Sequence, residues 1–171
     1  MGRKLVAALG VVLLGQIASA NSFLYTSALN GFQEVPSTNS QGVAVIQLTL
    51  DDTLLTASGT GAAFFLSGPA TAFLINDGPF GSSGPVVIAI NPGSISGNSI
   101  NFSATLPSLA SFQNLKAILD ARNGYFNIHT SSFAAGEIRG QIAPVPEPMA
   151  LAVVGVGLVT LVRRRRRRSS L

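Results

Sequence analysis

The sequence predicts a mainly β domain of antiparallel strands in the middle of a 171-residue chain. One reason is the strict alternation of apolar and polar residues, since successive side chains of a strand point to opposite faces. Residues 43–50, for example, place Ala44, Ile46, Leu48 and Leu50 on one face. The other reason is composition: glycine is abundant, charged residues make up only 11%, and cysteine is absent. Such a chain suits short strands with tight turns, packed without disulfides.

The first residues have the pattern of a secretory signal peptide, residues 1–20. Arg3 and Lys4 form a charged start, and residues 5–17 are mostly apolar. Ala18 and Ala20 then supply small side chains at the two positions that a signal peptidase reads. We therefore expect cleavage after Ala20, with a retained membrane anchor as the alternative.

Strand candidates follow one another along the central segment, separated by clusters of Gly, Pro, Asn or Ser. Asp51 and Asp52 predict the turn of a hairpin between the second and third candidates. In residues 98–105, Ile100, Phe102 and Ala104 face one way and polar residues the other, which is typical of a half-buried antiparallel strand. The candidates are residues 23–29, 43–50, 53–59, 62–66, 71–75, 86–90, 98–105, 125–129 and 137–142.

One segment has helical rather than strand periodicity. Ser108 is a plausible N-cap after Pro107, and Gly124 is a plausible stop. We expect this short helix to dock on one end or edge of the β domain rather than to bind a partner. The apolar stripe that predicts it consists of Leu109, Phe112, Leu115, Ile118 and Leu119.

The end of the chain combines a proline-rich motif, an uncharged apolar run over residues 149–162 and a basic cluster. As a helix the run would span about 21 Å, which is short of the roughly 30 Å of a bilayer core. The basic cluster would hold the C-terminus on the cytoplasmic side. The motif is Val145, Pro146, Glu147 and Pro148, and the cluster is Arg163, Arg164, Arg165, Arg166, Arg167 and Arg168.

This order of Pro-Glu-Pro, short apolar helix and arginines resembles the PEP-CTERM sorting signal of bacterial envelope proteins. The resemblance implies recognition by an exosortase, a membrane peptidase that removes the helix and the arginines after transient insertion in the inner membrane. The segments are then a signal peptide at 1–20, a domain at 21–144, a sorting signal at 145–168 and a tail at 169–171. A permanent anchor without processing is the alternative fate of the tail.

The basic balance of the chain lies almost wholly in these two signals. Between them remain three basic and six acidic residues, a net charge near −3. The sequence therefore gives no support to nucleic-acid binding.

Four stretches of the central segment resemble the CHRD domain, the repeat unit of chordin. They are residues 28–36 (Ala-Leu-Asn-Gly-Phe-Gln-Glu-Val-Pro), 84–87 (Gly-Pro-Val-Val), 125–130 (Tyr-Phe-Asn-Ile-His-Thr) and 136–142 (Gly-Glu-Ile-Arg-Gly-Gln-Ile). The resemblance implies a single antiparallel Greek-key β-sandwich, with chordin as the precedent for extracellular protein binding.

Candidate chemistry is sparse in this segment. CHRD domains often carry His-Ile-His before an Asn-Gly-Pro turn, whereas this chain reads Leu74-Ile75-Asn76-Asp77-Gly78-Pro79. His129 is the only histidine, and with Glu137 it is at best a weak metal candidate, because a metal site needs several converging ligands. No Gly-x-Ser-x-Gly elbow or phosphate-binding loop occurs.

Glu137 and Arg139 lie two apart on a predicted strand, so we expect them on one face as an exposed ion pair, or packed against Glu34 or a turn. We expect no catalytic residues, no cofactor and no enzymatic activity. The alternative is a metal-dependent extracellular enzyme of the copper/zinc dismutase kind.

The function expected from the sequence is that of an exported protein of the bacterial envelope or extracellular matrix. Its expected partners are signal peptidase, an exosortase-type peptidase and an extracellular protein or polysaccharide ligand.

Overall fold

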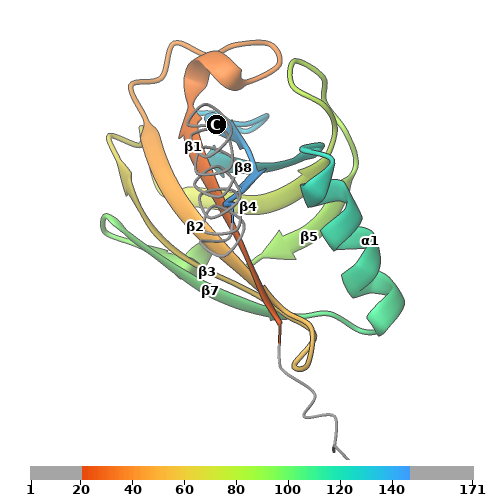
Figure 1. Ribbon diagram of the computed structural model, residues 1–171. Helices are drawn as coiled ribbons and strands as arrows, with labels where there is room; N and C mark the ends of the chain where they lie inside the picture. The colour runs from red at the N-terminus through yellow and green to blue at the C-terminus, as the bar shows by residue number, and fades with distance from the viewer. Residues whose placement is uncertain (1–20, 147–171) are drawn as a thin grey trace, which may run out of the picture.

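The computed structural model describes residues 21–146, which form ten strands, one α-helix and two short 3-10 helices (Figure 1). The prediction of a mainly β, antiparallel domain with one helix is confirmed. The strands are β1 (Ser22–Asn30), β2 (Val43–Asp51), β3 (Thr56–Phe64), β4 (Ala70–Asp77), β5 (Val86–Ile90), β6 (Ile95–Ser96), β7 (Ser99–Thr105), β8 (Gly124–Thr130), β9 (Ile138–Gln141) and β10 (Ala143–Pro144). The helices are η1 (Gly31–Gln33), η2 (Pro92–Ser94) and α1 (Leu109–Asp120).

All strands join one antiparallel sheet in the order β5-β4-β8-β9-β1-β2-β3-β7-β6, with β10 paired to β1. Strands β1 and β9 share the single register pair Asn30–Arg139. The sheet is therefore continuous through only one pair of residues at this point. Figure 1 shows the sheet curled, with β1, β2, β3 and β7 facing β4, β5 and β8. The Greek-key sandwich is not confirmed, because the strands follow one hydrogen-bonded path rather than two separate sheets.

The core fills the inside of the curl. Phe73 of β4 and Phe102 of β7 stand far apart in the sheet order, yet their ring centroids are 5.3 Å apart in an edge-to-face arrangement. Phe126 of β8 lies 5.6 Å from Phe73 and 6.1 Å from Phe102. Each of these buried aromatic rings contributes about 1.5–3 kcal/mol by leaving water, so their contact stabilises the closed curl.

The alternation in residues 43–50 is confirmed. Ala44, Ile46, Leu48 and Leu50 are all buried, and the residues between them face outward. The hairpin after them is also confirmed, since Asp51 Oδ1 accepts hydrogen bonds from the backbone N–H groups of Thr53 and Leu54.

The prediction of two strands at 53–59 and 62–66 is wrong, because β3 is continuous from Thr56 to Phe64. Gly59 and Gly61 lie where the two predicted strands meet, and both pair with β2 inside the continuous strand. A Cβ at Gly59 would overlap the Phe102 ring. This glycine therefore permits close packing rather than a turn.

The helix begins where the sequence predicts, with the Ser108 side chain accepting from the Ser111 N–H. Phe112, Leu115 and Leu119 are buried, but Leu109 is exposed. The Tyr25 hydroxyl donates to Asp120 at 2.8 Å and ties the helix end to β1. The helix is thus docked on its own domain.

The predicted stop at Gly124 is wrong. The helix ends at Asp120, and Arg122 adopts the left-handed conformation with φ of 59°. The Arg122 N–H bonds to the Leu119 carbonyl and the Asn123 N–H to the Ile118 carbonyl, which is the Schellman arrangement. An arginine therefore holds the place that glycine usually takes, and Gly124 is the first residue of β8.

The last predicted strand, 137–142, corresponds to the shorter β9 at Ile138–Gln141, and β10 follows it outside the predicted range. No helix among residues 21–146 is long and apolar enough to cross a membrane. The apolar run at 149–162 lies outside the described residues.

Candidate functional site

The two weak metal candidates have separate hydrogen-bond partners. His129, on β8, is partly exposed, and its Nδ1 lies 2.9 Å from the Ala134 carbonyl oxygen. Glu137 is fully buried just before β9. Within residues 21–146 no three His, Cys, Asp or Glu side chains group closely enough to hold a metal ion.

The buried Glu137 carboxylate joins three segments that are distant in sequence. Its Oε1 accepts from the Ser40 hydroxyl at 2.6 Å and from the Ser67 N–H at 2.8 Å. Its Oε2 accepts from the Thr130 hydroxyl. These donors come from the β1–β2 connection, the β3–β4 connection and the end of β8. The carboxylate therefore links these three segments. Because both of its oxygens already accept hydrogen bonds, they are poorly available to bind a metal.

The ionised form of Glu137 is favoured in the folded protein. Burial alone would raise its pKa, but the hydrogen bonds from Ser40, Thr130 and Ser67 outweigh burial and hold the pKa below its ordinary value. The charge is thus retained inside the domain by three hydrogen-bond donors.

Arg139 is the second buried charge, with only 2% of its surface exposed. Its guanidinium donates to the Ser82 carbonyl at 2.8 Å and the Pro79 carbonyl at 3.0 Å. Its Cζ lies 3.4 Å from the centroid of the Tyr125 ring. Arg139 therefore holds the β4–β5 connection down over β8 and β9.

The expectation of an exposed ion pair between Glu137 and Arg139 is wrong. Both side chains are buried, Glu137 precedes the strand that contains Arg139, and the ion pair formed among residues 21–146 is Lys116–Asp120. The alternative expectation, packing near Glu34 or a turn, describes Arg139 better. The charge of Arg139 opposes the rise that burial causes in the pKa of Glu34, and its guanidinium donates a hydrogen bond to the Ser82 carbonyl in the β4–β5 connection.

Glu34 lies beside this cluster with an unpartnered oxygen. Its Oε1 and the Asn127 Oδ1 are both buried without a hydrogen-bond partner. A Cβ built on Gly136 would lie 2.9 Å from each of them, so the two acceptors meet around this glycine. Burial raises the pKa of Glu34 to about 7, although the positive charge of Arg139 opposes the shift. The Glu34 carboxyl therefore takes up a proton near neutral pH. Only the protonated form has a hydrogen that it can donate in a hydrogen bond.

This raised pKa predicts a loss of stability as pH rises. The folded state binds the Glu34 proton more tightly than the unfolded chain, so the contribution is complete below about pH 4.5 and is lost as pH rises towards about 7. Allowing for solvent screening, we expect a fall of about 1–2 kcal/mol that Glu34→Gln removes. Urea denaturation at several pH values measures it.

The other titratable groups are present in both proteins, so the difference between the two stability curves isolates the contribution of Glu34. Equal slopes for wild type and Glu34→Gln between about pH 5 and about pH 8 would contradict the assignment.

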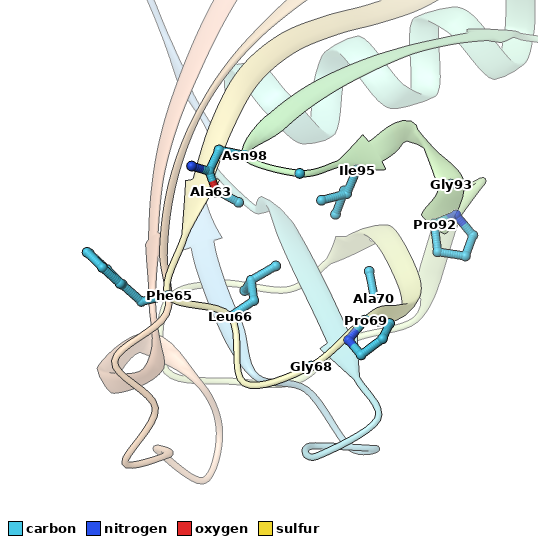
Figure 2. Close-up of a pocket in the computed structure, with 11 residues that line it drawn as sticks. Ala63, Phe65, Leu66, Gly68, Pro69, Ala70, Pro92, Gly93, Ile95 and Asn98 are labelled. Carbon is cyan, nitrogen blue, oxygen red and sulfur yellow. The ribbon is translucent and has the colours of Figure 1, made fainter.

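A cavity of about 470 Å³ opens where the β3–β4 and β5–β6–β7 connections meet. Figure 2 shows Leu66 and Ile95 pointing into it, and Phe65 pointing away from it. Glycine, proline and small apolar residues supply most of the remaining lining, with Asn98 at one side. This cavity brings together no acid, base and nucleophile.

Of the predicted processing residues, the structure describes Val145 and Pro146. The Val145 N–H donates to the Leu24 carbonyl at 2.9 Å, beside β1. Ala18, Ala20, Glu147, Pro148 and the cluster Arg163 to Arg168 lie outside the described residues.

The sequence did not predict the partners of the two buried charges. Ser40, Ser67 and Thr130 are common residues at scattered positions, and only the fold brings them to Glu137. The available signal was the scarcity of charge: a Glu and an Arg close together in a segment with few charges are candidates for specific roles.

The geometry defines a class of protein: a curled antiparallel β domain whose loops are fastened by a buried glutamate and a buried arginine. The sequence matches the CHRD domain over residues 25–142, more than half of the chain, and the protein belongs to the CHRD-domain family. Comparison with curated proteins and with solved structures gives no significant match.

Proposed function

We propose that this protein is an exported, non-enzymatic CHRD-domain protein of the bacterial envelope or extracellular matrix. In this proposal signal peptidase removes residues 1–20, and an exosortase-type peptidase cuts near Val145 to Pro148 and removes the apolar helix and arginines. The released domain then serves as a binding or structural module outside the cell.

The observation that carries the proposal is the position of the two domain ends. The core lies between Tyr25 and Ile142, so neither predicted cut removes a core residue. The backbone bond from Val145 to Leu24 brings the outgoing chain beside β1, the first strand after the predicted signal peptide. The two ends of the described chain therefore lie beside β1 and outside the core, which supports removal of the flanking segments without damage to the domain.

The predicted N-terminal residue of the mature protein, Asn21, lies beside the Asp52 carboxylate. The Asn21 backbone nitrogen lies 3.0 Å from Asp52 Oδ1, and its side-chain amide donates to Asp52 Oδ2 at 3.1 Å. These bonds lower the pKa of Asp52. Cleavage after Ala20 would turn this nitrogen into an ammonium group facing a carboxylate, a more favourable pair than the amide.

Replacing Arg163 to Arg168 with serine tests the sorting part. We expect loss of surface localisation in the native host, because each arginine contributes about 1 kcal/mol of attraction to the anionic inner leaflet. The domain should keep its circular dichroism spectrum, since its core ends at Ile142.

Replacing Lys116 and Arg122 with serine is the control for basic charge within the domain. Equal mislocalisation of this control, or normal surface localisation without the six terminal arginines, would contradict the sorting proposal.

A further inference from the structure

The outward face of β1, β2, β3 and β7 is almost free of charge. Its outward-facing residues are uncharged except Asp51, at the last position of β2. About a quarter of the residues of an ordinary soluble domain are charged. The other acidic and basic residues of the described chain lie on loops, on the helix, before β2 or on the facing half of the sheet.

Six amide and hydroxyl side chains form two rows across the middle of this face. Strand register aligns Gln47, Thr60 and Asn101 in one row, and Thr49, Ser58 and Ser103 in the next. They line a shallow depression of about 300 Å³. None of the side-chain hydrogen bonds among residues 21–146 uses these six, so their donors and acceptors remain available to a ligand.

Two aromatic side chains stand at the end of the same face. Phe64 and Phe65 are 42% and 76% exposed, and their ring centroids are 6.3 Å apart. Phe65 holds a left-handed backbone conformation with φ of 60°, which is costly for a residue other than glycine and is concentrated at binding sites. Figure 2 shows its ring turned away from the neighbouring cavity.

From these observations we propose that the outward face of β2, β3 and β7 binds a neutral polysaccharide chain. Sugar hydroxyls both donate and accept, as do the amide and hydroxyl groups of the two rows. The C–H face of a sugar ring packs on an aromatic ring, which Phe64 and Phe65 offer. An acidic polysaccharide would need Lys or Arg, and the described part of this face carries neither.

The dimensions favour a polymer over a single sugar. Thr60 and Phe64 are four positions apart on β3, which corresponds to about 14 Å along the strand. A protein partner fits less well, because the centre of a protein interface is apolar and this depression is lined mostly by polar side chains, with Gly59 and Phe102 beside them.

The inference deepens the proposed role outside the cell, but its test is independent of processing. Full-length protein, kept in a detergent without a sugar headgroup, is sedimented with insoluble cellulose, curdlan and mannan, and with alginate gel as the acidic comparison. We expect binding to at least one neutral polymer and none to alginate. Failure to bind any neutral polymer would overturn the inference and leave the processing proposal standing.

Matched variants locate the site. The double change Gln47→Ala with Asn101→Ala, and separately Phe65→Ala, should each weaken binding about tenfold or more. Gln113→Ala on α1 and Phe80→Ala in the β4–β5 connection remove the same chemistry from other exposed positions and should leave binding unchanged. Alanine at 65 keeps the backbone conformation, and circular dichroism verifies folding.

An equal loss of polysaccharide binding in the test and control variants would overturn the assignment of the site to this face. Concentration-dependent self-association that the Phe65→Ala change abolishes would also overturn it, because the face would then be an interface between copies of this chain.

Discussion

Replacing Glu137 with alanine is expected to lower the free energy of unfolding by about 3–5 kcal/mol. The change leaves the buried Ser40 and Thr130 hydroxyls and the part-buried Ser67 N–H without their acceptor. Each hydrogen bond to a charged group contributes about 1.5–3 kcal/mol, and the contributions within one network do not add fully. Urea denaturation of the purified protein measures the loss.

Glu137→Gln is the matched control for this prediction. It keeps the shape and one carbonyl oxygen but loses the charge, so the expected loss is smaller, about 1–3 kcal/mol. An alanine variant within about 1 kcal/mol of wild type would contradict the cohesive role of this carboxylate.

The same residue predicts sensitivity to acid. Its folded-state pKa is below the ordinary value, so its contribution is present above about pH 4.5 and is lost as pH falls further. Glu34 acts in the opposite direction at higher pH, because its pKa is raised. Stability should therefore be greatest in mildly acidic solution.

Replacing Arg139 with methionine is expected to cost about 2–4 kcal/mol. The change removes the cation over the Tyr125 ring and the donors to the Pro79 and Ser82 carbonyls. It also removes the positive charge that restrains the pKa of Glu34, so that pKa should rise further. Denaturation gives the first effect, and an NMR titration of the Glu34 carboxyl gives the second.

Arg122→Met is the control, since Arg122 is exposed and makes no side-chain hydrogen bond among the described residues. It should change stability by no more than about 0.5 kcal/mol. Equal effects of the two substitutions would contradict the role of Arg139.

The strands were predictable because burial on one face produces a period of two. Residues 86–90 were predicted with the bounds that β5 has, and Ser108 marked the start of α1 through its side-chain oxygen. These signals are local. They depend on a few neighbouring residues and not on what the other face of the sheet contacts.

The sequence-based predictions were wrong where contacts between residues far apart in the sequence determine the structure. Gly59 reads as a break in sequence, but its lack of a side chain makes room for Phe102, more than forty positions away. Arg139 reads as a surface charge, but Pro79 and Ser82 cover it. The single pair between β1 and β9, which makes the sheet continuous, has no local signature at all.

The central claim is that both ends of this CHRD-domain protein are removed around an intact domain. Intact-mass spectrometry of the protein isolated from the surface of its native host tests it most directly. We predict a chain that begins at Asn21 and ends within Val145 to Pro148. A surface protein that still carries residues 1–20, or Arg163 to Arg168, would contradict the claim.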